Sequence, residues 1–304
     1  MTVLHNMPPP PVREALIAQG LDLSGADWAA LSGGRTNRLW RLERPGRKPL
    51  VVKLYADPVP NPLFPNDPAQ ERWMLLHLQG HGIAPRPELH CDTALGPVLV
   101  YGYLGGVPWS GRAHLAARTL HRLHGIAPPP DLRRVPDGSA ELASQTRAIL
   151  SGCTSQAARA ALGLFPDGEV PPSGRAALLH GDPVPANMIV GPTGLRLIDW
   201  QCPAMGDPSE DLALFLSPAM QITYRGAPLS VAEHAAFLAS YPCRATATRY
   251  RSLAPWYHWR MLAYCLWRYE RGDGAAGRAA RAEEGALTEQ LHRKTGRFQR
   301  NFIN

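Results

Sequence analysis

A stretch near the middle of the chain, residues 176–213, constrains the fold more than any other part of the sequence. It contains two short apolar runs and then a run in which apolar and polar residues alternate, and all three read as strands. A turn with glycine and proline precedes the third run and reverses the chain. Asp182 and Asn187 precede the second run, and Asp199 follows the third. The pattern predicts a hairpin that brings these three side chains to one end of a small sheet. Two carboxylates and an amide oxygen are hard ligands that suit Mg²⁺.

A lysine upstream of this stretch is unusual for the composition of the chain. Of the 32 basic residues only three are lysines, namely Lys48, Lys53 and Lys294. Lys53 lies inside the apolar run 50–55, which reads as a strand. A lysine in such a strand either extends to solvent past its neighbours or holds a phosphate, and both interpretations stay open on local evidence.

An adjacent pair of glycines precedes the strand that ends at Leu42. Because glycine lets backbone N–H groups approach anions, such a loop can cover phosphates, although an ordinary turn has the same sequence. The residues of this loop that could lie against such a phosphate are Ser32, Gly33, Gly34 and Asn37.

A helix is predicted over residues 68–80, with Asp67 as N-cap and Gly80 as the stop. Glu71 falls in its first turn, where a carboxylate interacts favourably with the helix dipole. The alternative is that Glu71 forms an ion pair that positions Lys53. The local sequence is compatible with both.

Length and composition limit the remaining possibilities. A chain of 304 residues can form one large domain or two lobes, each with its own core. Five scattered cysteines without a CxxC pair favour a reducing compartment and argue against a zinc site. The sequence shows no secretory signal pattern and no apolar run of membrane-spanning length. We therefore expect a cytoplasmic protein with no membrane partner.

The net charge of +7 is compatible with nucleic acid, a membrane surface or an anionic ligand as partner. The arginines are spread along the chain, and basic and aromatic residues are not interleaved in a patch, so we expect no nucleic-acid partner. The basic segment 278–300 is the remaining candidate, and it predicts binding that weakens steeply with salt.

The predicted elements divide the chain into two lobes of an α+β protein. Residues 1–103 form a small lobe with an antiparallel sheet, and residues 104–304 form a larger, mostly helical lobe after a hinge at 104–106. The helices are predicted over residues 12–20, 68–80, 114–124, 141–164, 209–215, 230–241 and 245–270, and in the basic C-terminal segment.

Taken in order, the motifs resemble those of the aminoglycoside phosphotransferase and choline kinase superfamily. The order is a glycine turn, a strand lysine, a helix glutamate, a hinge, HGDPVPAN, a hairpin, IDW and GDPSEDLA, within residues 28–270. The resemblance implies a bilobal, protein-kinase-like fold. It also implies transfer of the γ-phosphoryl group of ATP to the hydroxyl of a small molecule, with Mg²⁺.

The resemblance further implies a role for each motif residue. Asp182 would be the catalytic residue that accepts the proton of the acceptor hydroxyl or orients it. Asn187 and Asp199 would be the Mg²⁺ ligands. Lys53 would meet the α- and β-phosphates and pair with Glu71.

The same resemblance implies that His180 and Asp211 support the catalytic loop. The loop departs from the pattern of many relatives, because residues 183–186 (PVPA) hold two prolines and no glycine before the metal-ligand position. Trp200 and Gln201 stand where protein kinases have the phenylalanine and glycine of DFG. These departures, and the lack of an APE-ended activation segment, argue against a protein substrate.

The acceptor stays open. An amino alcohol such as choline, ethanolamine or thiamine is our first expectation, and an aminoglycoside or sugar is the alternative. A nucleotide-binding pseudokinase scaffold is the alternative from another class. Residues that would recognise an amine, or else belong to a helix core or surface, are Trp256, Tyr257, Trp259, Trp267, Glu210, Glu233 and Glu270.

Overall fold

The computed structural model describes three segments of the chain, residues 6–31, 36–55 and 60–294. They form two compact units, which are described separately. The first unit contains Met1–Trp109 and Ala186–Pro203, and the second contains Ser110–Pro185 and Ala204–Asn304. The two lobes predicted from the sequence, residues 1–103 and 104–304, have other boundaries, because residues 104–109 and 186–203 belong to the first unit.

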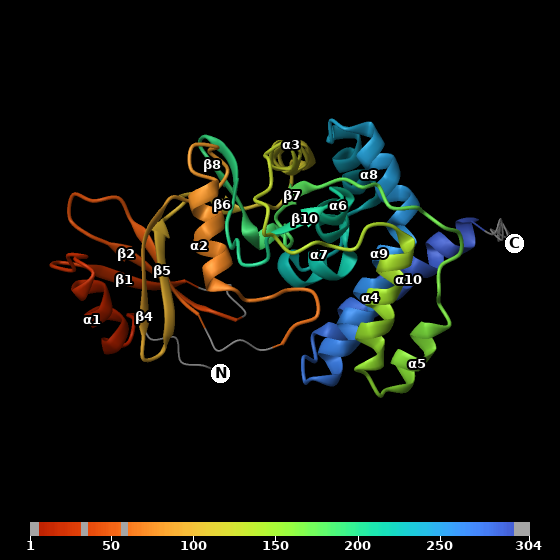
Figure 1. The fold of residues 1–304 in the computed structure, drawn as a ribbon, viewed down its shortest axis with the longest axis horizontal. Coiled ribbons are helices and arrows are strands. Elements are labelled where there is room, and N and C mark those ends of the chain that lie inside the picture. The colour runs from red at the N-terminus through yellow and green to blue at the C-terminus, as the bar shows by residue number, and fades with distance from the viewer. Residues whose placement is uncertain (1–5, 32–35, 56–59, 295–304) are drawn as a thin grey trace, which may run out of the picture. The chain divides into compact units, whose positions relative to one another are not determined.

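A five-stranded antiparallel sheet organises the first unit, in the order β1-β2-β3-β5-β4 (Figure 1). The strands are β1 (Asp27–Leu31), β2 (Arg38–Glu43), β3 (Leu50–Leu54), β4 (Pro87–Thr93) and β5 (Gly96–Gly102). β3 is central and buried along its whole length. The predicted strand that ends at Leu42 is β2, the run 50–55 is β3, and the apolar run 96–103, which also reads as a strand, is β5. The structure adds β1 and β4.

Both faces of this sheet are covered. Side chains alternate along a strand, so successive residues of β3 point to opposite faces. Val52 and Leu54 of β3 pack in one core with α1 (Pro10–Ala18). The side chain of Lys53, on the opposite face, meets α2 (Pro68–His77). Alternation therefore aims the strand lysine at the helix that carries the glutamate.

A second sheet of the first unit has three strands in the order β6-β8-β9. Its strands are β6 (Val107–Pro108), β8 (Met188–Gly191) and β9 (Gly194–Leu197). The predicted hairpin is thus β8–β9, with Met188 opposite Leu197.

The second unit is mostly helical. Its helices are α3 (Ala113–His124), α4 (Ser139–Ser151), α5 (Gln156–Leu162), α6 (Ser209–Leu216), α7 (Pro218–Arg225), α8 (Val231–Ser240), α9 (Arg244–Glu270) and α10 (Ala276–Lys294). The long helix α9 contacts α4, α5, α6 and α10. A small antiparallel pair, β7 (Ala177–Leu179) with β10 (Ala204–Gly206), completes the unit.

The single helix predicted over residues 141–164 is wrong. The structure has two helices, α4 and α5, because Gly152 ends the first and Ser155 caps the second. The Ser155 hydroxyl accepts a hydrogen bond from Ala158 N at 3.1 Å. The local stop and start signals therefore outweigh the continuous helical periodicity.

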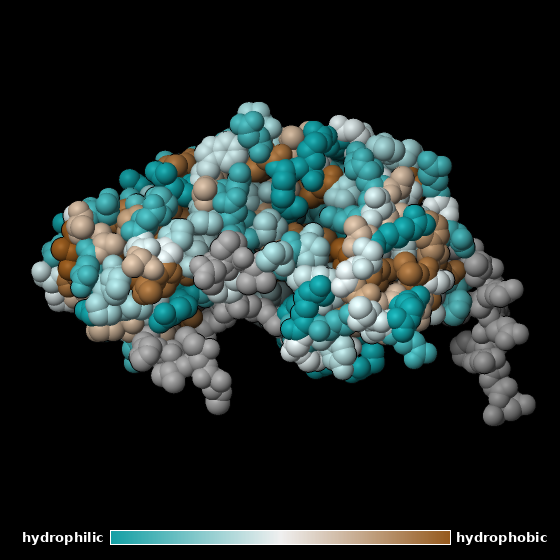
Figure 2. All heavy atoms as spheres, turned by 60° about the horizontal axis from the view of Figure 1, so that its bottom comes forward, coloured by the Kyte–Doolittle hydropathy of each residue, from teal (hydrophilic) through white to brown (hydrophobic). Residues whose placement is uncertain are grey.

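Hydrophilic residues predominate over the face drawn in Figure 2, with smaller groups of hydrophobic residues between them. Among the helices within residues 6–31, 36–55 and 60–294, none is long and apolar enough to cross a membrane.

Candidate active site

Lys53 is the centre of a buried charged cluster in the first unit. Its side chain is 2% exposed, and its Nζ lies 2.5 Å from Glu71 Oε2 and 2.5 Å from Asp199 Oδ1. We call Lys53, Glu71 and Asp199 the lysine cluster. The structure thus contains the ion pair that was one of two interpretations of Glu71, and it adds a second carboxylate.

Glu71 is fixed in place by its helix and by neighbouring donors. Asp67 begins α2 by accepting hydrogen bonds from Ala69 N and Gln70 N, which confirms it as N-cap. Glu71 Oε2 also accepts a hydrogen bond from the Tyr55 hydroxyl at 2.5 Å, and Oε1 accepts one from Trp200 N at 3.3 Å.

Asp199 occupies the end of the β8–β9 hairpin in a left-handed backbone conformation, with φ of 64°. Such a conformation is costly for a residue other than glycine, and it marks many functional sites. The Ile198 N–H donates to the Asn187 carbonyl at 2.9 Å, so the hairpin ladder brings Asn187 and Asp199 to one end. The Asp199 side chain is 31% exposed, unlike its two cluster partners.

Opposing effects set the protonation of the lysine cluster. Burial alone would lower the pKa of Lys53, but Asp199 and Glu71 raise it overall. Burial raises the pKa of Glu71, against the lowering effect of Lys53. Lys53 therefore stays cationic, and a buried cation of this kind can neutralise a phosphate.

The donor set of Asn187 and Asp199 fits a hard divalent cation. Asp199 Oδ1 meets Lys53, while Oδ2 has no hydrogen-bond partner within the described part of the chain. In the same described segments, no group of three or more His, Cys, Asp or Glu side chains is arranged to hold a metal. Two protein oxygens suit Mg²⁺ that takes its other ligands from phosphates and water.

The predicted phosphate-covering loop is described only in part. Ser32, Gly33 and Gly34 lie outside the described residues. The side chain of Asn37 is 9% exposed and hydrogen-bonds to two residues that the sequence reasoning did not assign to the site, Asn66 and Gln201.

Asp182 belongs to the second unit, so the structure groups Lys53, Glu71, Asn187 and Asp199 in one unit and the predicted base in the other. Asp182 follows Gly181, whose φ of 76° makes the turn after β7. It is 7% exposed, and its N–H donates to His180 Nδ1 at 3.3 Å.

The turn before Asp182 is held from within the same unit by Asp211 of α6. Its two carboxylate oxygens accept hydrogen bonds from His180 N at 2.9 Å and Gly181 N at 3.0 Å. His124 Nε2 lies 3.1 Å from Asp211 Oδ2, and His124 Nδ1 lies 2.7 Å from the Tyr241 hydroxyl. Burial opposes ionisation, but the hydrogen bond and charge of His124 lower the pKa of Asp211 overall, with help from His180.

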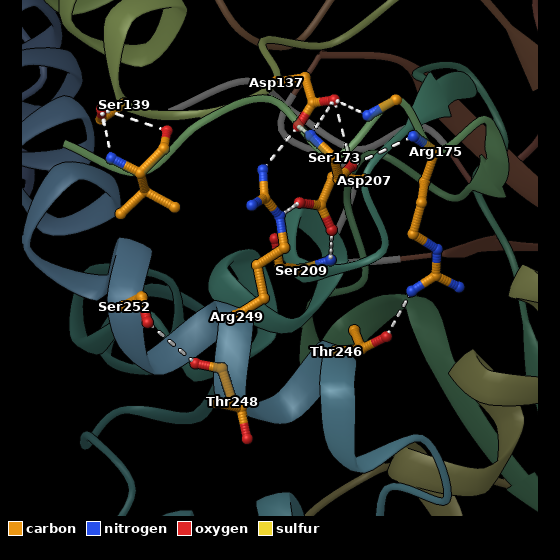
Figure 3. A network of polar contacts seen from close by, with 12 residues as sticks. Asp137, Ser139, Ser173, Arg175, Asp207, Ser209, Thr246, Thr248, Arg249 and Ser252 are labelled. Carbon is orange, nitrogen blue, oxygen red and sulfur yellow. Dashed lines mark hydrogen bonds and ion pairs between the residues drawn. The ribbon is translucent and has the colours of Figure 1, made fainter.

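A second network ties α9 to the segments around α6 (Figure 3). The Arg249 guanidinium pairs with Asp207 and, at 2.7 Å, with Asp137. Asp207 also accepts a hydrogen bond from Ser209 N at 2.9 Å, at the start of α6. Asp137 in turn accepts from Ser173 N at 2.8 Å. Asp211 is thus carried by a helix whose beginning is itself anchored.

Three of the aromatic candidates for an acceptor pocket are core residues of the second unit. Trp256 and Trp259 are 3% and 0% exposed and meet Phe165 edge to face, with ring centroids 5.0 and 5.2 Å apart. Trp259 Nε1 donates to Ala161 O at 2.7 Å. The hydroxyl of Tyr257, 4% exposed, lies 2.8 Å from Ser209 Oγ. Trp267, the fourth, is half-buried and stacks on Tyr264 at 6.0 Å.

The three acidic candidates are also engaged within the second unit. Glu210 pairs with Arg260 at 2.5 Å, and Glu233 pairs with Arg225 at 2.7 Å while completing the capping box of α8. Glu270 accepts hydrogen bonds from Thr154 N and Ser155 N at the beginning of α5. Each carboxylate therefore has a structural partner.

The match to a known protein family agrees with the phosphotransferase that the resemblance implied. The model of the phosphotransferase enzyme family (APH) matches residues 27–256. Among curated proteins, none matches.

Solved structures share the fold at low sequence identity. A choline/ethanolamine kinase family protein from Mesorhizobium loti has a TM-score of 0.59 at 17% identity, covering 87% of this chain and 90% of its own. A choline kinase from Cryptosporidium parvum has 0.61 at 13% identity, covering 91% of each chain. Spectinomycin phosphotransferase APH(9)-Ia has 0.56 at 15% identity, covering 94% and 100%.

The solved structures confirm the predicted α+β, protein-kinase-like fold. The family match confirms the prediction of a phosphotransferase. Since the family model spans most of the sequence, the chain belongs to the phosphotransferase enzyme family.

Proposed function

We propose that the protein transfers the γ-phosphoryl group of ATP to the hydroxyl of a small molecule. The observation that carries this proposal is the lysine cluster: a buried lysine held between Glu71 and Asp199, with Asn187 at the same end of the hairpin. Phosphoryl transfer depends mainly on positioning and on neutralising charge. The lysine cluster supplies a fixed cation, and Asp199 and Asn187 supply two oxygens suited to a metal ion.

Each residue then has a defined task. Lys53 binds the α- and β-phosphates, and Glu71 keeps it in place. Asn187 and Asp199 would hold Mg²⁺, which would supply further neutralisation of the phosphate charge. Asp182 orients the acceptor hydroxyl and accepts its proton. Asp211 keeps the turn before Asp182 in one conformation.

For the acceptor we propose an amino alcohol such as choline, ethanolamine or thiamine. The solved choline and choline/ethanolamine kinases named above support this choice. An aminoglycoside or a sugar is the second candidate, supported by the spectinomycin phosphotransferase, which was solved with ADP and spectinomycin. Trp259, Glu210 and Glu270 are already bonded to other groups of the protein, so we expect other residues to recognise an amine.

We also infer a cytoplasmic location. It is supported by the five cysteines, all within the described residues, none of which forms a disulfide.

The test is a pooled screen of amino alcohols, aminoglycosides and sugars with Mg·ATP, in which acceptor-dependent release of ADP is measured. Asp182→Asn should lower the rate by about 10²- to 10⁴-fold, as expected for loss of a general base. The matched control is Asp131→Asn, an exposed aspartate of the same unit, which should keep the wild-type rate.

Two results would contradict the proposal in different ways. Full turnover by Asp182→Asn would remove the base from its role. Binding of Mg·ADP without phosphorylation of any acceptor would instead favour the nucleotide-binding scaffold.

A further inference from the structure

Three carboxamides form a connected group in the first unit. Asn37 and Asn66 pair reciprocally: Asn37 Nδ2 donates to Asn66 Oδ1 at 2.8 Å, and Asn66 Nδ2 donates to Asn37 Oδ1 at 2.9 Å. Asn37 Nδ2 also donates to Gln201 Oε1 at 3.0 Å. We call Asn37, Asn66 and Gln201 the amide clamp.

The amide clamp joins three segments that are far apart in sequence. Asn37 directly precedes β2, at the end of the predicted phosphate-covering loop, and Asn66 directly precedes Asp67, the N-cap of the helix with Glu71. Gln201 lies two residues after Asp199. The clamp therefore connects a phosphate-binding segment, the helix of the glutamate and the metal-binding hairpin end.

Two further contacts support the connection. Gln201 Oε1 lies 3.4 Å from Lys53 Nζ, so one oxygen faces both the clamp and the lysine cluster. Cys202 Sγ donates to Pro65 O at 3.1 Å, which ties the chain after Asp199 to the segment before α2 a second time. Lys53 Nζ therefore faces oxygens of Glu71 on α2 and of Asp199 and Gln201 after β9.

The donors of Asn37 are committed to this arrangement. A carboxamide has two N–H donors, and those of Asn37 meet Asn66 and Gln201. Asn37 and Gln201 are both 9% exposed. A buried carboxamide whose donors are satisfied in this way fixes the backbone around it, because leaving such donors unpaired is costly.

We infer that the amide clamp is a positioning device which sets the phosphate-binding and metal-binding parts of the site together. Gln201 and Asn66 act through Lys53, Glu71 and Asp199 rather than on the nucleotide. Asn37 acts through its position at the end of the loop, so within the nucleotide site it is a positioning residue. The inference rests on the proposed use of Mg²⁺ and a nucleotide.

The inference predicts a coupling between metal and nucleotide. In the wild type, Mg²⁺ should increase the affinity for ADP by about 5- to 150-fold, the usual range of coupling between two ligands. Asn66→Ala and Gln201→Met should reduce this increase to about twofold or less while changing the affinity for ADP without Mg²⁺ far less. Methionine approximates the volume of glutamine, so Gln201→Met removes the acceptor with little change in packing.

The experiment measures ADP binding by calorimetry with and without Mg²⁺ for the wild type, the two variants and the double variant. The double variant should lose no more coupling than the more affected single variant, since both residues act in one unit. Asn61→Ala is the matched control, because Asn61 Oδ1 accepts hydrogen bonds from Leu63 N and Phe64 N in the same segment. It should lower the melting temperature comparably and keep the coupling.

Each outcome decides the matter. Wild-type coupling in Asn66→Ala and Gln201→Met would overturn the inference and leave the proposed function intact, as would equal loss of coupling in Asn61→Ala. Absence of ADP binding by the wild type, with and without Mg²⁺, would overturn both the inference and the proposed function.

Discussion

Two buried acidic residues, one in each unit, show opposite electrostatic behaviour. Glu71 and Asp211 are 1% and 0% exposed, yet burial raises the pKa of Glu71, whereas the neighbours of Asp211 lower its pKa despite burial. The partners explain the difference. For Glu71, burial and the charge of Asp199 outweigh the lowering effect of Lys53 and Tyr55. Asp211 instead accepts hydrogen bonds from two backbone N–H groups and contacts His124, and together these outweigh its burial.

The difference separates the lysine cluster, whose side chains can exchange bonding partners, from the turn held by Asp211, whose partners are fixed. Asp199 is the most exposed member of the lysine cluster, at 31%, so under the proposed function an oxygen of a phosphate could replace its oxygen on Lys53. The backbone donors that meet Asp211 are part of the chain itself. We therefore expect charge removal to disturb the first region most, and loss of a hydrogen-bond acceptor to disturb the second.

The largest effect is expected from Lys53→Met, which leaves Glu71 and Asp199 together without a cation. Removing one partner of a buried ion pair typically costs about 3–5 kcal/mol, and we expect a loss near that range in the free energy of unfolding measured in urea. Lys48→Met is the control, because Lys48 is exposed in the turn before β3 and should change stability by less than about 0.5 kcal/mol. Similar losses in both variants would show that the cluster is not held by its cation.

The same contrast explains what the sequence could predict. Lys53 and Asp199 were recognisable because each is an ionisable residue in an apolar strand pattern. Lys53 lies inside such a pattern, and Asp199 lies at the end of one. Short-range rules located these residues, since a capped helix and a hairpin are local features. They left the ion pair of Lys53 with Glu71 as one of two interpretations, and the structure shows that pair.

The amide clamp was beyond such rules. Asn66 and Gln201 sit in irregular segments, and the pairing of Asn37 with Gln201 spans 164 residues. An asparagine in a loop has many local explanations, so its type alone indicates little. The tryptophan-rich helix α9 likewise has a pattern that fits a pocket or a core, and only packing against Phe165 distinguished them.

An intermediate effect is expected from Asp211→Asn, which places an amide where the carboxylate accepts backbone N–H groups. One of these donors then faces another donor, which costs about 1–3 kcal/mol at neutral pH. Because the pKa of Asp211 is lowered below its usual 3.8, its contribution to stability is present above that pH and is lost as the pH falls through the lowered value. The difference in unfolding free energy between wild type and variant should therefore shrink below about pH 4.

A urea series from pH 7 to pH 3 measures this change. Asp131→Asn, in an exposed position, provides the baseline for a carboxylate without such partners. A difference that stays constant over the whole series would mean that the pKa of Asp211 is the same in the folded and the unfolded protein.

The smallest effect is expected from Glu270→Gln, which tests whether an acid near a helix beginning serves stability or substrate. The Ser155 hydroxyl, followed by the Thr154 N–H, the Ser155 N–H and the Thr154 hydroxyl, lowers the pKa of Glu270 to about 2 by hydrogen bonding. Glutamine keeps one acceptor oxygen at the beginning of α5, so the loss should be about 0.5–1 kcal/mol, as for a weakened cap. Thermal unfolding measures this loss, and the KM for the acceptor found in the screen should stay at the wild-type value. An increase of that KM at unchanged stability would return Glu270 to the acceptor site and show that backbone-held carboxylates of the second unit also bind substrate.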